Sequence, residues 1–151
     1  MHIIEDNLTG DAVIALLQEH FREMHAITPP GSAHVLDIAS LRSADITFWS
    51  AWSDDTLLGC GALKELDTST GEIKSMRTVE AYKRKGVASA ILRHIVSIAQ
   101  HREYTYLNLE TGSFPAFEPA RKFYEKHGFE YRTPFADYKD DPNSVFMAKC
   151  L

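Results

Sequence analysis

The residues best suited to chemistry form a short basic loop in the middle of the chain, Tyr82-Lys83-Arg84-Lys85-Gly86-Val87-Ala88-Ser89. The loop leads into a predicted helix, so its backbone N–H groups have no intrahelical partners and lie at the positive end of the helix dipole. Such a turn suits a pyrophosphate, and Gly86 allows close approach of the backbone. An ordinary basic turn has the same composition, so the surrounding elements must decide between the two interpretations.

Hydrophobic periodicity predicts these surrounding elements. Helical spacing favours helices at residues 9–24, 33–41, 87–101 and 118–127, and strand-like patterns favour strands at 45–53, 56–66, 72–79, 104–110, 129–135 and 144–150. Thr9 is the expected N-cap of the first helix. The strand before the loop, the helix after it and the next strand form a crossover unit, which implies parallel pairing. We therefore expect one domain, residues 1–151, of the α+β class: a mixed, mostly antiparallel central sheet with helices on both faces.

Composition sets broad limits on the function. The chain has 151 residues, of which 44% are hydrophobic and 25% charged, as expected for a soluble domain with a core. No stretch approaches the ~20 apolar residues of a membrane helix, and the N-terminus does not resemble a signal peptide, so we expect a cytoplasmic protein without a membrane partner. The net charge of −5 argues against nucleic acid as a partner.

Cysteine and histidine positions do not suggest a metal site. Cys60 and Cys150 have no metal or redox spacing, and both lie in strand-like apolar stretches, so we expect two buried thiols. The seven histidines have no spacing that would complete a ligand set. We therefore expect no metal.

The stretch from Gly71 to Phe129 resembles the GCN5-related N-acetyltransferase (GNAT) family. The family's pyrophosphate loop follows Gln/Arg-x-x-Gly-x-Gly/Ala, which here reads Lys83-Arg84-Lys85-Gly86-Val87-Ala88. Lys83 replaces the usual Gln or Arg, and Arg84 stands where glycine is common, but both keep the loop basic. The later Phe123-Tyr124-Glu125-Lys126-His127-Gly128-Phe129 resembles the family's tyrosine-bearing helix and its Gly-Phe exit. Phe117 occupies the position where the family often has an asparagine, seven residues before that tyrosine.

The resemblance implies an acetyl-CoA-dependent N-acetyltransferase with the acyl-CoA N-acyltransferase fold. Pantetheine would enter between the strand before the loop and the next parallel strand, and a backbone N–H such as that of Met76 would polarise the thioester carbonyl. Tyr124 is the expected general acid, because a phenol with a pKa of ~10 is protonated at neutral pH. The residues expected to hold the coenzyme are Met76, Arg77, Thr78, Lys83, Arg84, Lys85, Gly86, Val87, Ala88, Ser89 and Phe117.

The base that deprotonates the amine stays open between two carboxylates and a water chain. Glu72 begins the predicted central strand, and Glu110 ends the next parallel strand. Active sites of open sheets gather near the carboxyl ends of parallel strands, which favours Glu110 for the base or for a substrate contact.

The expected acceptor is a primary amine of a small molecule, and two classes fit the sequence. The acidic segment 135–144 would attract a cationic acceptor such as a polyamine. Lys74, Arg77 and Arg121 would instead hold the carboxylate of an amino-acid-like amine. The family often forms homodimers, so a homodimer is a further expectation.

Two other functions compete with catalysis. A non-catalytic acyl-CoA sensor on the same fold would bind the coenzyme without turnover. A nucleotide-phosphate binding protein is the weaker alternative, because the chain has neither Gly-x-Gly-x-x-Gly nor a Gly-Lys-Ser/Thr loop.

Overall fold

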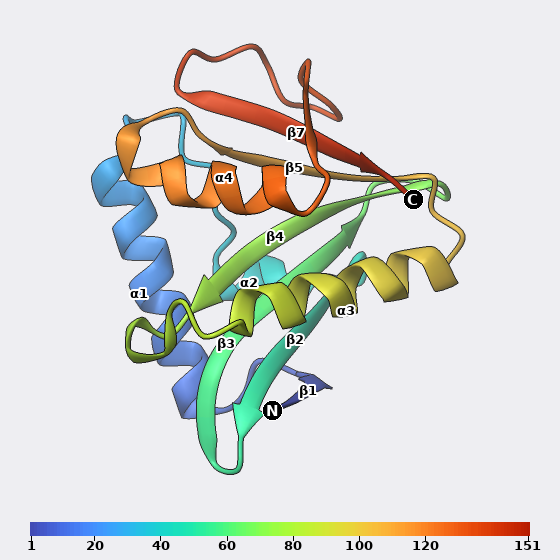
Figure 1. Ribbon diagram of the computed structural model, residues 1–151. Helices are drawn as coiled ribbons and strands as arrows, with labels where there is room; N and C mark the ends of the chain where they lie inside the picture. The colour runs from blue at the N-terminus through green and yellow to red at the C-terminus, as the bar shows by residue number, and fades with distance from the viewer.

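A seven-stranded sheet forms the centre of the computed structural model, which describes residues 1–151 (Figure 1). Its strands are β1 (His2–Glu5), β2 (Ile46–Ser53), β3 (Thr56–Glu65), β4 (Thr70–Thr78), β5 (Tyr106–Gly112), β6 (Glu130–Arg132) and β7 (Ser144–Cys150). The helices are α1 (Asp11–Ile27), α2 (Ile38–Leu41), α3 (Val87–His101) and α4 (Glu118–Lys126), with short 3-10 turns at Glu80–Tyr82 and Pro115–Phe117. The spatial order is β1-β2-β3-β4-β5-β7-β6, and every neighbouring pair is antiparallel except β4 and β5. The predicted α+β class is confirmed.

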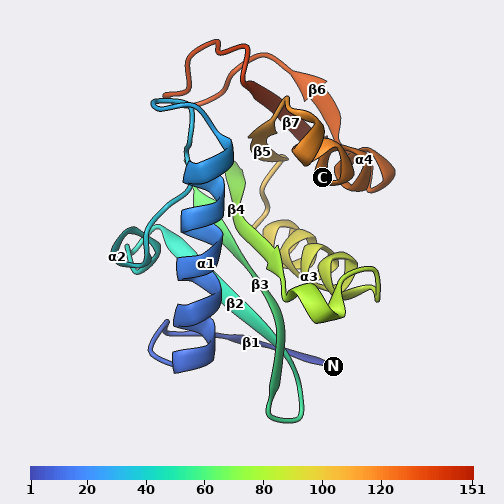
Figure 2. The same ribbon diagram turned by 90° about the vertical axis from the view of Figure 1, so that its left-hand side faces the viewer.

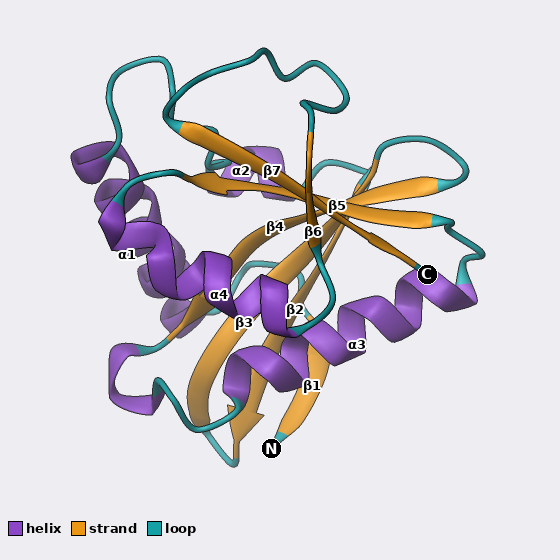
Figure 3. Cartoon of the chain, turned by 45° about the horizontal axis from the view of Figure 1, so that its top comes forward, coloured by secondary structure: helices purple, strands orange, loops and turns teal.

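Helices cover both faces of this sheet because adjacent strand residues point to opposite sides. On one face, α3 buries Val87, Ile91, Ile95 and Ala99, one residue per helical turn, in a core that also includes Tyr124 of α4. Helices α1 and α2 lie on the other face (Figures 2 and 3). They enclose a second apolar cluster there. Each fully buried aliphatic side chain stabilises the fold by about 1.5–3 kcal/mol. None of the helices combines the length and apolar character that crossing a bilayer requires.

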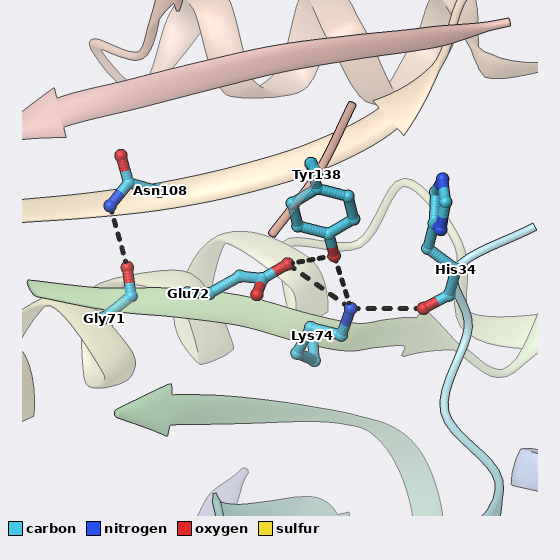
Figure 4. Close-up of polar contacts among 6 residues, drawn as sticks. All are labelled: His34, Gly71, Glu72, Lys74, Asn108 and Tyr138. Atoms are coloured by element: carbon cyan, nitrogen blue, oxygen red, sulfur yellow. Dashed lines mark hydrogen bonds and ion pairs between the residues drawn. The ribbon is translucent and has the colours of Figure 1, made fainter. Parts of the chain in front are cut away.

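The pairing of β4 with β5 stops after three residue pairs, the last of which is Glu72 with Asn108. Beside this last pair, the Asn108 amide donates a hydrogen bond to the Gly71 carbonyl oxygen at 3.3 Å (Figure 4). Arg132 donates to the Asn108 side-chain oxygen at 3.0 Å and fixes its orientation. Beyond this point the two strands diverge, as Figure 1 shows. The backbone of the second half of β4 therefore has no partner strand on the β5 side.

A β-bulge in β4 accompanies this divergence. Cys60 pairs with Arg77 and Ala62 with Lys74, so two residues of β4 lie opposite one residue of β3. The first of the two, Ser75, has a φ of 54°, and the Cys60 thiol contacts its carbonyl oxygen at 3.4 Å. A bulge bends the strand and increases its twist, which turns the end of β4 away from β5.

Most predicted elements are present, but several boundaries were wrong. α1 begins at Asp11 with Gly10 as its N-cap, because the Thr9 hydroxyl donates to Asn7 at 2.6 Å instead of capping the helix. The predicted helix 33–41 is helical only from Ile38 to Leu41, where Asp37 accepts a hydrogen bond from the Ser40 N–H at 2.8 Å.

Errors at the chain ends have a different origin, since the strands there are short or exposed. The edge strand β1 was not predicted, and the predicted strand 129–135 shortens to Glu130–Arg132.

Cys60 is buried as expected, and burial raises the pKa of its thiol to about 12. Cys150 is exposed at the end of β7, so the prediction of a second buried thiol was wrong.

The approach of α3 to β3 depends on a residue without a side chain. A Cβ at Gly59 would lie 2.7 Å from the Arg77 carbonyl oxygen and 3.1 Å from the Val87 side chain. We expect Gly59→Ala to lower the free energy of unfolding by about 1–3 kcal/mol, because the backbone of β4 must move. Urea denaturation measures this change.

The matched control is Gly10→Ala, since no atom lies within 4 Å of a Cβ at that position. It should cost less than about 1 kcal/mol, through weaker capping alone. Equal unfolding midpoints for wild type and Gly59→Ala would contradict the close packing described for β3, β4 and α3.

Candidate active site

A cavity of about 970 Å³ occupies the gap between the diverging strands. Its wall includes Ile73–Thr78 of β4 and Leu109–Gly112 of β5, which are the stretches beyond the last shared residue pair. The start of α3 and the side of α4 line it on one face of the sheet. The C-terminal half of α1 and residues 32–35 line it on the other face. The cavity therefore connects the two faces through the sheet.

The N-terminus of α3 forms one end of this cavity. The first helical hydrogen bond runs from the Ala90 N–H to the Gly86 carbonyl oxygen at 3.0 Å, so the N–H groups of residues 87–89 have no intrahelical acceptor. A Cβ at Gly86 would meet no atom within 4 Å, so the space beside the turn is open. Gly86 and Arg84 have φ values of 83° and 63°. This left-handed backbone explains why glycine suits position 84 in the family. The turn fits an anionic group such as a pyrophosphate.

The three basic residues of the loop divide between two hollows. Lys83 and Arg84 line the main cavity, and the Lys83 ammonium pairs with Glu80 at 2.7 Å. Lys85 does not line it. Its ammonium lies 5.8 Å from the centre of the Tyr82 ring, beside a second hollow of about 400 Å³. The structure thus separates Lys85 from the other residues expected to hold the coenzyme.

The other ten residues expected to hold the coenzyme all line the main cavity. They are Met76, Arg77, Thr78, Lys83, Arg84, Gly86, Val87, Ala88, Ser89 and Phe117. The Arg77 side chain turns toward α1, where its guanidinium contacts Glu19 at 2.9 Å and Glu23 at 2.6 Å. The Arg77 guanidinium is therefore already paired with carboxylates of α1.

Tyr124 lies on α4 and lines the same cavity. Its ring packs edge-on against Phe123 and Phe129, with centroid distances of 5.2 and 5.5 Å. Burial raises the pKa of the Tyr124 phenol. The group therefore stays protonated at neutral pH and is suited to donate a proton.

Of the two candidate bases, Glu110 is the one that lines the cavity. Burial raises the pKa of Glu110 to about 7, and Glu72 and Asp141 add to the shift. The Ser144 hydroxyl and the Lys74 ammonium oppose it. A carboxyl with a pKa near neutrality can accept a proton from a substrate and release it again.

Glu72, the other candidate base, lies outside the cavity wall and is only 2% exposed. One of its oxygens accepts hydrogen bonds from the Tyr138 hydroxyl at 2.6 Å and the Lys74 ammonium at 3.3 Å (Figure 4). The strand begins at Thr70, so Glu72 is an interior residue of β4. The expectation of an accessible carboxylate at a strand end was therefore wrong for Glu72.

Arg121 also differs from its expected position. It donates to the carbonyl oxygens of Gly112 and Phe114 at 2.8 and 2.9 Å and does not line the cavity. It stabilises the turn after β5, which the sequence did not reveal. Throughout the chain, no three His, Cys, Asp or Glu side chains converge in a way that would hold a metal ion.

Sequence reasoning missed the loop that closes the α1 side of the cavity. Residues 32–35 contribute to the wall, and residues 33–35, which were expected to be helical, are irregular. The Ser32 hydroxyl donates to Asp141 at 2.6 Å and accepts from Asn143 at 3.2 Å, which joins this loop to the segment before β7. Polar residues in two distant loops leave no periodic signal. The acidic, turn-rich composition of 135–144 was the only indication of their role.

The similarity of this chain to known proteins agrees with the geometry of the site. Residues 11–129 match the family described as Acetyltransferase (GNAT) family. The chain is 58% identical over 151 residues to the uncharacterized N-acetyltransferase YsnE of Bacillus subtilis (strain 168), covering 100% of both chains. It is 49% identical over 146 residues to the uncharacterized N-acetyltransferase YedL of Escherichia coli (strain K12), covering 97% of this chain and 92% of YedL.

A solved structure shows the same fold with coenzyme A bound. The PaiA N-acetyltransferase from Thermoplasma acidophilum in complex with coenzyme A superposes with a TM-score of 0.75 at 18% identity, covering 99% of this chain and 98% of PaiA. The family match extends over most of the chain, and the relatives share about half or more of its residues. The chain belongs to the acetyltransferase (GNAT) family and is an acetyl-CoA-dependent N-acetyltransferase.

Proposed function

We propose that this enzyme acetylates a primary amine of a small molecule by direct attack of the amine on the thioester in a ternary complex. One observation carries the proposal. A single cavity is lined by the N-terminus of α3, the unpaired edge of β4, Glu110 and Tyr124. The groups that would bind the donor, remove a proton and donate a proton therefore line one connected cavity.

The donor end of the cavity would hold acetyl-CoA, which supplies the activated acetyl group. The N–H groups of residues 87–89, with Lys83 and Arg84, would bind its pyrophosphate. The unpaired edge of β4 from Met76 to Thr78 would pair with pantetheine. Phe117 provides an apolar wall where the family often has asparagine, and its ring lies so close to Gly112 that a Cβ there would be 2.1 Å away.

The residues around the gap would accept and donate the protons that the reaction transfers. Glu110 takes a proton from the substrate ammonium, and the neutral amine attacks the thioester carbonyl carbon. The C–N bond forms and the C–S bond breaks, while the Met76 N–H polarises the carbonyl oxygen. Tyr124 donates its proton to the departing sulfur and recovers one from the attacking nitrogen. The products are an amide and a thiol, with one proton left on Glu110.

The buried Tyr124 phenol and the Glu110 carboxyl, whose pKa is near neutrality, lie in one cavity. This pair supports catalysis rather than a sensor function. A sensor would need only the donor end of the cavity. In a sensor, the acceptor end of the cavity and the groups of Glu110 and Tyr124 would have no function.

Tyr124→Phe should lower kcat by about 100- to 10,000-fold, because the thiolate would leave without a general acid. Release of thiol from acetyl-CoA across a panel of primary amines measures this change. Tyr131→Phe is the matched control, since Tyr131 is 53% exposed on β6 and should leave kcat unchanged. Calorimetry that shows acetyl-CoA binding without turnover of any amine would contradict the proposal and favour the sensor function.

Glu110→Gln should lower kcat and remove a pH-dependent change in stability. The folded-state pKa of Glu110 is raised from 4.5 to about 7, so its proton stabilises the fold at low pH. That contribution is lost as pH rises through about 7. Urea unfolding of both proteins at pH 5 and pH 8 measures the effect, and the wild type should lose more stability than Glu110→Gln over this interval. Equal losses would mean that Glu110 titrates normally.

A further inference from the structure

The acceptor must reach the thioester from the α1 side of the sheet, because the donor loop lies at the start of α3 on the opposite face. We call this part of the cavity the acceptor chamber. It is bounded by the C-terminal half of α1, residues 32–35, Lys74, Arg77 and Glu110. Its charges influence which amines it accepts, because opposite charges attract and like charges repel over the few ångströms of a binding site.

Arg77 brings no net positive charge to the chamber. The Arg77 side chain is 9% exposed, and its guanidinium pairs with both Glu19 and Glu23 of α1. Two carboxylates against one guanidinium leave an excess negative charge. The remaining Nε of Arg77 has no partner but is enclosed by protein, so a ligand does not reach it.

The ammonium of Lys74 is also fully engaged. It donates to the His34 carbonyl oxygen at 3.1 Å, to the Tyr138 hydroxyl at 2.9 Å and to Glu72 at 3.3 Å (Figure 4). An ammonium has three N–H donors, and each one has an acceptor here. The charge of Lys74 is balanced by the buried carboxylate of Glu72.

The groups that remain are neutral or negative. Burial lowers the pKa of His20 to about 4, with Arg77 adding to the shift, so its imidazole is neutral at physiological pH. Glu110 stands in the wall without a salt-bridge partner, and Asp141 lies close enough to raise its pKa. Met24, Ile27 and Val35 add apolar surface. The chamber therefore offers an amine a carboxylate and an apolar wall, and it offers a substrate carboxylate no free cation.

We infer that the acceptor is an alkyl- or arylalkylamine without a carboxylate on the carbon that bears the amino group. This inference rests on the proposed function and distinguishes the two acceptor classes that the sequence left open. The amino group must approach Glu110 to lose its proton, so a carboxylate one carbon away would lie beside a like charge. Such a contact inside a protein disfavours binding, and the paired Lys74 and Arg77 do not compensate for it.

Matched substrate pairs that differ only in this carboxylate test the inference. The pairs are histamine with histidine, tyramine with tyrosine, and 1,5-diaminopentane with lysine. We expect kcat/KM, measured by thiol release, to be at least about tenfold higher for the amine wherever a pair reacts. Amino acids that react as well as their amines would overturn the inference while leaving the N-acetyltransferase function intact. Failure of all three amines would also overturn it, whereas the proposed function itself fails only if no amine of the wider panel reacts.

A double variant tests the charge argument directly. Glu19→Gln with Glu23→Gln leaves Arg77 uncompensated, so the preference for the amine over its amino acid should fall by at least about threefold. The control is Glu118→Gln, which removes an exposed ion pair with Lys122 at 3.1 Å outside the chamber and should leave the preference unchanged. Thermal melting verifies folding, and Glu23→Gln alone replaces the double variant if that protein does not fold. An unchanged preference in a folded variant would overturn the charge argument.

Discussion

The end of the β4–β5 pairing at Glu72 and Asn108 is the constraint on which the site depends. Up to this point the two strands form an ordinary parallel pair, stabilised by the Asn108 contact with Gly71. Beyond it, the bulge at Ser75 turns β4 away and opens the sheet. A sheet that stayed paired would have no gap for pantetheine, and the two sides of the cavity would not communicate.

The contacts of Lys74 and Tyr138 give two neighbouring carboxylates, Glu72 and Glu110, different environments. Glu72 is buried and receives hydrogen bonds from Lys74 and Tyr138, so its charge is compensated. Glu110 lines the cavity without an ion-pair partner, and burial raises its pKa to about 7. Environment rather than residue type makes one of them structural and leaves the other suited to the role of the proposed base. The bond from Lys74 to the His34 carbonyl oxygen joins β4 to residues 32–35, and the bond from Tyr138 to Glu72 joins β4 to the segment before β7. Together they shape the acceptor chamber.

Features with a local signal were predictable from the sequence. The boundaries of α3 agree with its hydrophobic period, and the loop before it was recognisable from Gly86 and its basic neighbours. Tyr124 was found because its helix and the Gly-Phe exit are local patterns. Features that depend on distant contacts were not found. Glu72 is buried through Tyr138, 66 residues later, and the bulge at Ser75 has no pattern of its own.

The most direct test of the site is an NMR titration of the isotope-labelled protein with coenzyme A. Binding in the gap predicts the largest amide shift changes at Met76–Thr78 on β4 and at residues 87–89 at the start of α3. The second hollow beside Tyr82 and Lys85 should change less. Shift changes confined to that hollow, with the amides of β4 unaffected, would contradict a coenzyme site between β4 and β5.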